Sequence, residues 1–122
     1  MIAPEIRKMF EEKGIAAADY AKREEFAVLN AVATAEGALQ VAMEELAATL
    51  SGRKILILGA GRIAKVLIDM LGGFHADVTV AARKCSDLAW AKVYGCKAVH
   101  ISDMDGVLSE SEVVFNTVPA VL

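Results

Sequence analysis

Cysteine, histidine and proline are scarce in this 122-residue sequence, which contains two of each. Cys85 and Cys96 have neither a second cysteine pair nor a cluster of histidines near them in the sequence. A tetrahedral metal site needs four such ligands, so we predict no metal site and two reduced thiols. The scarcity of cysteine also excludes a fold that is held together by disulfide bonds.

The sequence also has no strong excess of positive or negative charge. The 13 basic and 16 acidic residues are scattered, and the net charge is −3. A stripe of Lys and Arg that could follow a nucleic-acid backbone is therefore missing, which argues against nucleic-acid binding. Charged residues interrupt residues 1–10, and the apolar stretch 26–50 contains Glu36, Glu44 and Glu45, so we expect neither a signal peptide nor a membrane span. We expect a soluble, cytoplasmic protein.

Two short elements are predicted in residues 1–21. Pro4 suits the first turn of a helix that ends at about Lys13, and Gly14 is typical of the position just after a helix. Residues 15–18 are predicted to form a brief buried strand, which has no earlier strand to pair with. We interpret residues 1–21 as a remnant of an upstream substrate domain.

Residues 22–50 are predicted to form a long interdomain helix with one apolar stripe. The stripe consists of Leu29, Val32, Leu39, Met43, Leu46 and Leu50. Glu36 falls on the same stripe, where a carboxylate needs a partner, a proton or an open cleft. The neighbouring Gly37 predicts a close approach of another segment, since glycine is costly within a helix. The start of the helix is predicted near Asn30 or Thr34, because either residue suits an N-cap.

Strand-like and helix-like patterns alternate in residues 51–122. Strands are predicted at residues 54–58, 77–82, 97–100 and 113–115. Helices are predicted at residues 62–71, from Ser86 or Asp87 to Tyr94, and after an approximate capping box of Ser102 and Asp105. This alternation predicts the α/β class, with a Rossmann-type doubly wound parallel sheet in the strand order 3-2-1-4.

The predicted sheet is incomplete, because a full dinucleotide domain has two more strands beside the fourth. We therefore interpret residues 51–122 as a partial NAD(P)-binding domain. The fourth strand is then an apolar edge of the sheet. We expect a second copy of the chain to cover it in a homodimer, either directly or by exchange of the N-terminal helix.

A glycine-rich turn follows the first strand of this unit. Its sequence is Gly59-Ala60-Gly61-Arg62-Ile63-Ala64. In the dinucleotide fingerprint the first glycine permits a tight turn, the second lets the backbone approach the pyrophosphate, and the small third residue lets helix and strand pack closely. Amides from about Arg62 onward would face the phosphates, and the helix dipole would add to the attraction.

The end of the second strand bears on the choice between NADP and NAD. NAD-dependent enzymes place an Asp or Glu there to bind the ribose hydroxyls, but residues 80–82 are Val-Ala-Ala. Arg83, Lys84 and Ser86 follow, and they offer two cations and a hydroxyl for a 2′-phosphate. We therefore predict NADP. NAD is the alternative, with Arg83 stacked on the adenine or in solvent.

The loop after the fourth strand is the third part of the predicted cofactor site. Asn116, Thr117, Val118 and Pro119 lie at the carboxyl edge of the sheet, where ligands bind in this fold, so we expect them near the nicotinamide ribose. The alternative is a simple turn before proline. His75 lies on the far side of the sheet and His100 nearer the adenine side, so neither is assigned as the catalytic acid–base residue.

Several segments resemble the family of the dipicolinate synthase A subunit. The run from Asp19 to Ala38, with its Asn30-Ala-Val-Ala-Thr-Ala-Glu-Gly37 sequence, is similar to the interdomain segment of that family. Residues 58–64, 82–84 and 115–119 resemble its cofactor domain. That domain is in turn similar to the cofactor domain of D-2-hydroxyacid dehydrogenases. The resemblance extends over nearly the whole chain from about Ile15.

The resemblance implies oxidation of dihydrodipicolinate, a small dicarboxylate, to pyridine-2,6-dicarboxylate during bacterial sporulation, together with the flavoprotein-like B subunit of dipicolinate synthase. It also implies that the long helix lines the cleft, where Asn30 and Glu36 would contact the substrate or its domain. The alternative is that these two residues only cap and stabilise the helix. Because the family has more sequence on both sides, we expect this chain to be inactive alone.

Two other functions are open at this point. One is an NADP-dependent lobe similar to shikimate or hydroxyacid dehydrogenases, which shares the glycine turn and the Asn-Thr-x-Pro loop. The other is a non-catalytic module that binds a cofactor or mediates dimerisation through the long helix.

Overall fold

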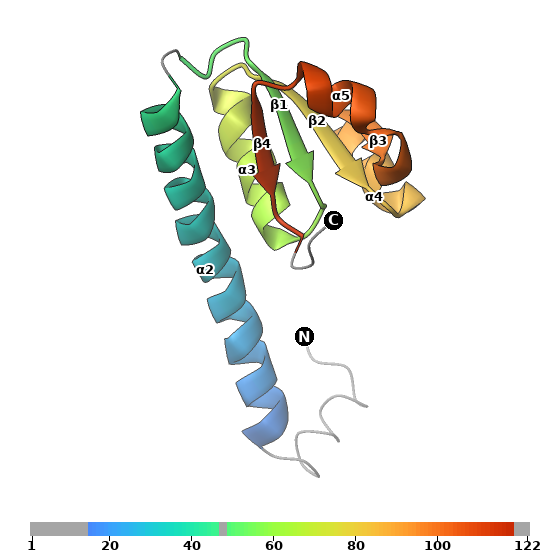
Figure 1. Ribbon diagram of the computed structural model, residues 1–122. Helices are drawn as coiled ribbons and strands as arrows, with labels where there is room; N and C mark the ends of the chain where they lie inside the picture. The colour runs from blue at the N-terminus through green and yellow to red at the C-terminus, as the bar shows by residue number, and fades with distance from the viewer. Residues whose placement is uncertain (1–14, 47–48, 119–122) are drawn as a thin grey trace.

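The computed structural model describes the backbone of residues 15–46 and 49–118, with side chains from residue 23 onward. A long helix precedes alternating strands and helices (Figure 1). The elements are α2 (Ile15–Glu45), β1 (Lys54–Leu58), α3 (Arg62–Gly73), β2 (Asp77–Ala82), α4 (Cys85–Val93), β3 (Lys97–His100), the 3₁₀ helix η1 (Ile101–Asp103), α5 (Asp105–Glu110) and β4 (Val113–Asn116). The predicted helix from Pro4 to Lys13 lies outside the described residues, as does Pro119.

The four strands form one parallel sheet in the order β3-β2-β1-β4. Ile57 of β1 is paired with Val80 of β2 on one side and with Phe115 of β4 on the other. Parallel neighbours joined through helices give the doubly wound arrangement, so the predicted fold class and strand order are confirmed. All four strands point the same way, and their carboxyl ends share one edge of the sheet (Figure 1).

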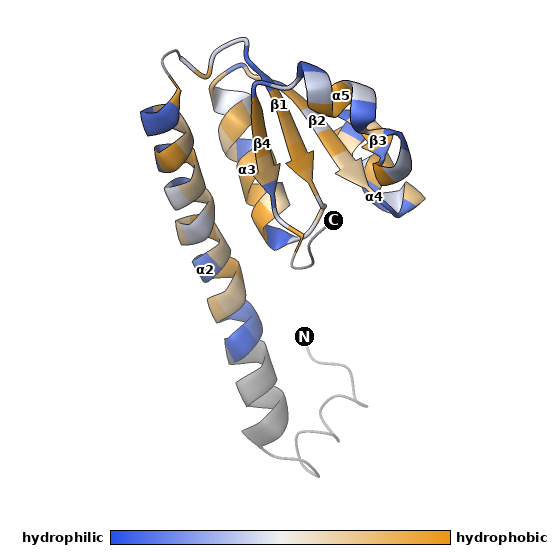
Figure 2. Cartoon of the chain, viewed as in Figure 1, coloured by the Kyte–Doolittle hydropathy of each residue, from blue (hydrophilic) through white to orange (hydrophobic). Residues whose placement is uncertain are grey.

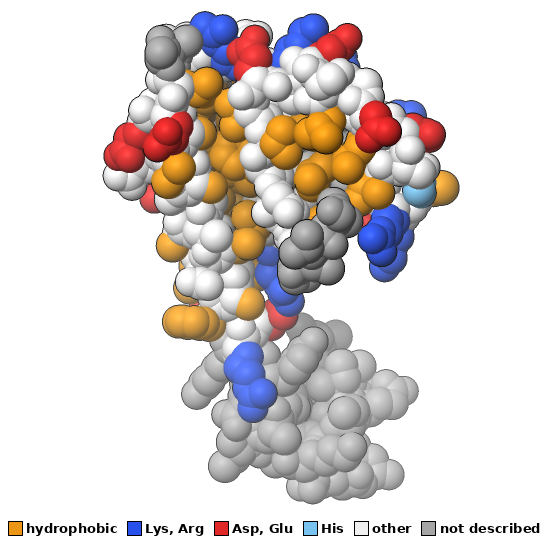
Figure 3. All heavy atoms as spheres, viewed as in Figure 1, with side chains coloured by type: hydrophobic (Ala, Val, Ile, Leu, Met, Phe, Trp, Pro, Cys, Tyr) orange, Lys and Arg blue, Asp and Glu red, His pale blue; other side chains and the backbone are white. Residues whose placement is uncertain are grey.

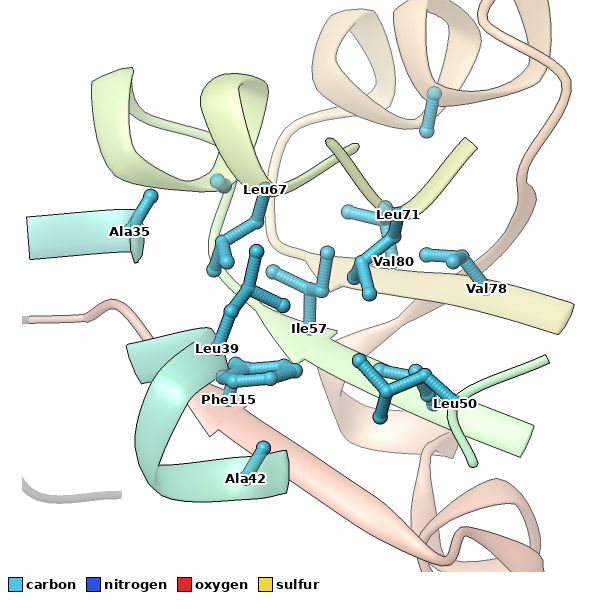
Figure 4. Packing of buried hydrophobic residues seen from close by; sticks show 13 residues of the cluster. Ala35, Leu39, Ala42, Leu50, Ile57, Leu67, Leu71, Val78, Val80 and Phe115 are labelled. Atoms are coloured by element: carbon cyan, nitrogen blue, oxygen red, sulfur yellow. The ribbon is translucent and has the colours of Figure 1, made fainter. Parts of the chain in front are cut away.

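The larger part of the core lies between one face of the sheet and helices α2, α3 and α4. Ile57 of β1 and Leu67 of α3 are fully buried there, and Leu39 of α2 and Phe115 of β4 pack beside them (Figure 4). β1 and β2 are apolar along almost their whole length, as Figure 2 shows, because both faces of these strands are covered.

A smaller cluster covers the opposite face of the sheet. Leu56, Leu58 and Ala81 are buried there against partly buried residues of η1, α5 and the loop after β4. Side chains alternate between the two faces of a strand, so Leu56 and Leu58 belong to this cluster while Ile55 and Ile57 belong to the larger one. The central strand is therefore held from both sides.

The start and end of α2 differ from the prediction. Residues 15–18, predicted as a strand, are the first turn of this helix, and the predicted starts at Asn30 and Thr34 lie within it. Alanines at positions 16–18 favour a helix, and nothing before Glu45 breaks it. The helix ends at Glu45 rather than Leu50, and Leu50 is instead buried just before β1.

The buried stripe of α2 agrees with the predicted one only in part, since it includes Leu39 but not Leu29 or Met43. It consists of Ala31, Ala35, Leu39 and Ala42, whereas Leu29 and Met43 are 62% and 46% exposed. Glu36 therefore lies outside the stripe and is exposed, and a Cβ at Gly37 would meet nothing within 4 Å. The predictions that Glu36 lies on the buried stripe and that another segment closely approaches Gly37 are wrong, because three alanines and Leu39 form the buried face.

Smaller corrections concern the ends of other elements. α4 begins at Cys85, one residue before the predicted start, and the backbone of Lys84 caps it. The predicted capping box of Ser102 and Asp105 does not form: the backbone N–H of Ser102 donates to His100 Nδ1 at 3.1 Å, and Met104 is the N-cap of α5. The amide of Ser102 is thus bonded to the His100 ring and not to the carboxylate of Asp105.

α2 also has the length and apolar composition of a membrane-spanning helix over residues 23–45. Core helices of soluble proteins share these properties but are mostly buried, whereas here 22% of the segment is buried, along the stripe that packs against α3.

Candidate dinucleotide site

Gly59 forms the turn between β1 and α3. Its φ of +104° lies in a region that favours glycine, and its N–H donates to the carbonyl of Ala81 at 2.8 Å. A Cβ on this residue would come within 2.6 Å of Thr117 Oγ1 and 3.1 Å of Val118 Cγ2. Gly59 therefore permits the loop after β4 to approach the turn, beyond its predicted role in the turn itself.

Thr117 closes this junction. Its backbone N–H and its hydroxyl both donate to the carbonyl of Leu58, at 3.0 and 2.7 Å. The side-chain oxygen of Asn116 accepts from the N–H of Val118 at 3.1 Å, which shapes the next residues into a turn. The structure thus brings together the glycine turn and the Asn116-Thr117-Val118 loop that the sequence assigned to one site.

The first turn of α3 offers backbone amides to an anion. Gly61, the N-cap, has extended backbone geometry and no side chain that could cap the helix. The first intrahelical bond runs from Lys65 N–H to the carbonyl of Gly61 at 3.0 Å, so the amides of Ile63 and Ala64 have no partner within the helix. A Cβ at Gly61 would meet nothing within 4 Å. The open space and these amides fit a pyrophosphate.

The other residues of the motif hold this turn in place. Ala64 is fully buried, which lets α3 lie close to the sheet as the fingerprint requires. Ala60 and Ile63 are half-buried and pack against the larger core cluster.

Arg62 is paired with Glu24 of α2. The guanidinium donates from Nε at 2.9 Å and from Nη2 at 2.7 Å to Glu24 Oε1, and Nη2 is 2.5 Å from Oε2. This hydrogen bonding and the positive charge of Arg62 hold the pKa of Glu24 below its usual value, against an opposing effect of burial. Nothing in the sequence marks this contact, because the two residues are 38 positions apart.

Two cations follow β2 at the same edge of the sheet. β2 ends at the buried Ala82, and Arg83, Lys84 and Ser86 are all exposed. Among the side chains of residues 23–46 and 49–118, neither Arg83 nor Lys84 makes an ion pair. Ser86 lies in the first turn of α4. The structure thus places exposed basic groups directly after β2, at the carboxyl edge of the sheet.

The comparisons with known proteins agree with this geometry. Residues 11–121 match the family described as the NAD-binding domain of D-isomer specific 2-hydroxyacid dehydrogenases. The chain belongs to this family.

This NAD-binding domain is similar to the A subunit of dipicolinate synthase from Bacillus subtilis (strain 168), with 25% identity over 101 residues. Among solved structures it resembles the A subunit of dipicolinate synthase from Bacillus halodurans, with a TM-score of 0.77 and 27% identity over 91% of this chain. The solved structure of the Bacillus subtilis protein also has a TM-score of 0.77, at 20% identity over 98% of this chain. The resemblance stated from the sequence is confirmed.

The chain spans only part of these relatives. The match to the Bacillus subtilis sequence covers 83% of this chain but 34% of that protein, and the two structural matches each cover 40% of the solved chain. What is shared is therefore the NAD-binding domain with its long preceding helix.

The two predicted substrate-side residues of this domain lie on different flanks of α2. A groove of about 440 Å³ runs between α2 and β4, and its lining includes Thr34 and Val41. At 100° per residue Asn30 lies on the same flank as Thr34 and Val41, whereas Glu36 lies on the opposite flank. Both side chains are exposed. The structure thus keeps Asn30 on the groove side and moves Glu36 away from it.

The histidines and cysteines are not gathered at the glycine turn. His75 lies in the turn before β2 with a φ of +56°, and His100 ends β3 with Nδ1 2.8 Å from Ser102 Oγ. Cys85 is exposed at the start of α4. Cys96 is half-buried, and burial raises the pKa of its thiol, which favours an unreactive thiol there.

Proposed function

We propose that this chain is the dinucleotide-binding part of an oxidoreductase similar to the A subunit of dipicolinate synthase, and that the whole enzyme oxidises dihydrodipicolinate to pyridine-2,6-dicarboxylate. The observation that carries the proposal is the closed junction of Gly59 with Thr117 beside a long preceding helix. The likeness to the dipicolinate synthase structures over both the helix and the sheet supports it. The link to sporulation and a cytoplasmic location belong to the same proposal, and rest on this likeness.

A nicotinamide dinucleotide bound here would accept a hydride from the substrate. The residues of this chain would bind and orient the dinucleotide. The first amides of α3 would hold its pyrophosphate in the open space at Gly61. The Asn116-Thr117-Val118 turn would border the nicotinamide half at the carboxyl edge of β4. Asn30, on the flank of the groove, is the proposed contact toward the substrate.

The cofactor is proposed to be NADP, because Arg83 and Lys84 are exposed cations where NAD enzymes have a carboxylate. Arg83→Ala is expected to weaken NADPH binding about 10- to 100-fold, since a hydrogen bond to a charged group contributes about 1.5–3 kcal/mol. NADH binding is expected to change less than about twofold. Isothermal titration calorimetry with both nucleotides measures this.

Lys92→Ala is the matched control for this substitution. It removes an exposed positive charge at the end of α4, away from the carboxyl edge, and is expected to leave both affinities unchanged. Wild-type protein that binds NADH as tightly as NADPH, or an Arg83→Ala effect equal for both, contradicts the choice of NADP and favours NAD.

The reaction is tested with the whole enzyme, of which this chain is the dinucleotide-binding part, both alone and together with the B subunit of dipicolinate synthase as the proposed partner. Product formation from dihydrodipicolinate is followed by the ultraviolet absorbance of pyridine dicarboxylate. No product under either condition, in a preparation that binds cofactor, contradicts the proposed substrate. Turnover of 2-hydroxyacids instead supports the second candidate, a hydroxyacid dehydrogenase lobe, which the family match favours. Folded protein without nucleotide binding favours an assembly module.

A homodimer is also proposed, because β4 is an edge of the described sheet and apolar side chains surround it. Val114 of β4 is 40% exposed and Val41 of α2 is 57% exposed. Figure 3 shows hydrophobic side chains gathered along α2 and over the sheet beside α5. Sedimentation equilibrium is expected to give twice the chain mass, whereas a monomer at micromolar concentrations contradicts the proposal.

A further inference from the structure

The Glu24–Arg62 pair connects the N-terminal part of α2 to the first residue of α3, outside the buried core. Glu24 lies in the segment of α2 that extends past the carboxyl edge of the sheet (Figure 1), and Arg62 is the first residue of α3. The buried residues of α2 begin only at Ala31, about two turns further along. The ion pair is therefore a contact between the projecting segment of α2 and the residue that follows the glycine turn.

Glu24 uses the edge of the guanidinium that a phosphate would use. Nε and Nη2 form one side of the planar guanidinium, and both donate to the carboxylate. Arginine binds phosphate through the same kind of paired donors, so one edge cannot serve both anions at once. Because Arg62 directly follows Gly61, its long side chain is within reach of the space assigned above to the pyrophosphate.

Charge favours the same conclusion. The carboxylate of Glu24 remains ionised at neutral pH, since Arg62 lowers its pKa. A carboxylate held beside the first turn of α3 repels a pyrophosphate and reduces the attraction of the amides of Ile63 and Ala64. Glu24 thus opposes the dinucleotide both as a rival for the guanidinium and as a like charge.

We propose that Glu24 is an autoinhibitory residue of the dinucleotide site, which competes with the cofactor phosphates for Arg62 and thereby sets the cofactor affinity. The inference rests on the proposed dinucleotide-binding function and names a regulation of the same site. Linkage is reciprocal, so a bound dinucleotide releases Glu24 and loosens the projecting segment of α2. Cofactor occupancy is in this way communicated to the part of the chain that precedes the sheet.

The test compares Glu24→Gln with Glu25→Gln in calorimetric titrations with NADPH and NADH. Glu25 is an exposed neighbour, and its substitution makes the same change in net charge. Glu24→Gln is expected to bind the preferred nucleotide about 3- to 5-fold more tightly than wild type, and Glu25→Gln to bind within about twofold of wild type. An equal gain in nucleotide affinity in both variants would mean that net charge causes the effect, and would overturn the proposal.

A double-substitution cycle with Arg62→Gln shows whether the two residues act together. In the Arg62→Gln background, Glu24→Gln is expected to change the affinity by less than half as much as in wild type. The reason is that the guanidinium for which Glu24 and the phosphates compete is absent. Hydrogen exchange gives a second readout: amides of residues 20–30 are expected to exchange faster when nucleotide is bound to wild type, but not when it is bound to Glu24→Gln.

The outcomes separate the inference from the function on which it rests. If wild type and Glu24→Gln bind nucleotide equally, or Glu24→Gln binds more weakly, Glu24 merely positions Arg62 and the inference fails while the proposed function stands. If no variant binds either nucleotide although all are folded, the proposed function fails and the inference fails with it.

Discussion

Gly59→Ala is expected to lower the free energy of unfolding by about 2–4 kcal/mol and to abolish dinucleotide binding. The backbone conformation at φ +104° costs a non-glycine residue about 1–3 kcal/mol. The new Cβ would also lie 2.6 Å from Thr117 Oγ1, so the hydroxyl would lose its bond to Leu58, at a further cost of about 1 kcal/mol. Urea unfolding followed by circular dichroism measures the loss.

Gly61→Ala is the matched control, because the same atom is added two positions away. Gly61 has a φ of −83°, and a methyl group added there would meet nothing within 4 Å, so stability is expected to change by less than about 1 kcal/mol. The methyl group would occupy the space of the pyrophosphate, so nucleotide affinity is expected to fall at least about 10-fold. Equal destabilisation by both substitutions would contradict this division of roles.

Leu67→Ala is expected to have the other largest effect, a loss of about 2–5 kcal/mol in the free energy of unfolding. Leu67 is fully buried and lies between α2 and the sheet, near Leu39 and Ile57 (Figure 4). Its removal leaves a cavity that the neighbouring alanines of α2 are too small to fill. The midpoint of urea unfolding reports the change.

Leu29→Ala makes the same chemical change on the outside of α2. Leu29 is 62% exposed, so its substitution is expected to alter stability by less than about 0.5 kcal/mol. A comparable loss in both variants would mean that Leu29 is buried in solution by another molecule, and that the packing described around Leu67 does not alone determine stability.

The central sheet was predictable because its signals are local. Residues 54–58 and 77–82 are short apolar runs bounded by glycine and charged residues, and the structure gives the same bounds to β1 and β2. The order of the strands followed from the alternation of strands and helices. The glycine turn was predictable for the same reason, since Gly59 and Gly61 occupy fixed positions between a strand and a helix.

The features that the sequence did not reveal depend on distant segments. The face of α2 that becomes buried is set by the shape of α3, which accepts alanines, and hydrophobicity alone favoured larger residues such as Leu29. Glu24 and the hydroxyl of Thr117 act across 38 and 59 positions, and no local pattern marks either contact. Residues such as these become recognisable only once the chain is folded.

The bond between Thr117 and Leu58 also has a consequence for the order of folding. β4 follows β1, β2 and β3 in the sequence, and the loop after it supplies the two hydrogen bonds from Thr117 to the carbonyl of Leu58. A nascent chain can therefore pair β1, β2 and β3 before its nucleotide cradle has its final shape. Contacts of such long sequence separation form late and slowly, so binding competence is acquired only when residue 117 has docked.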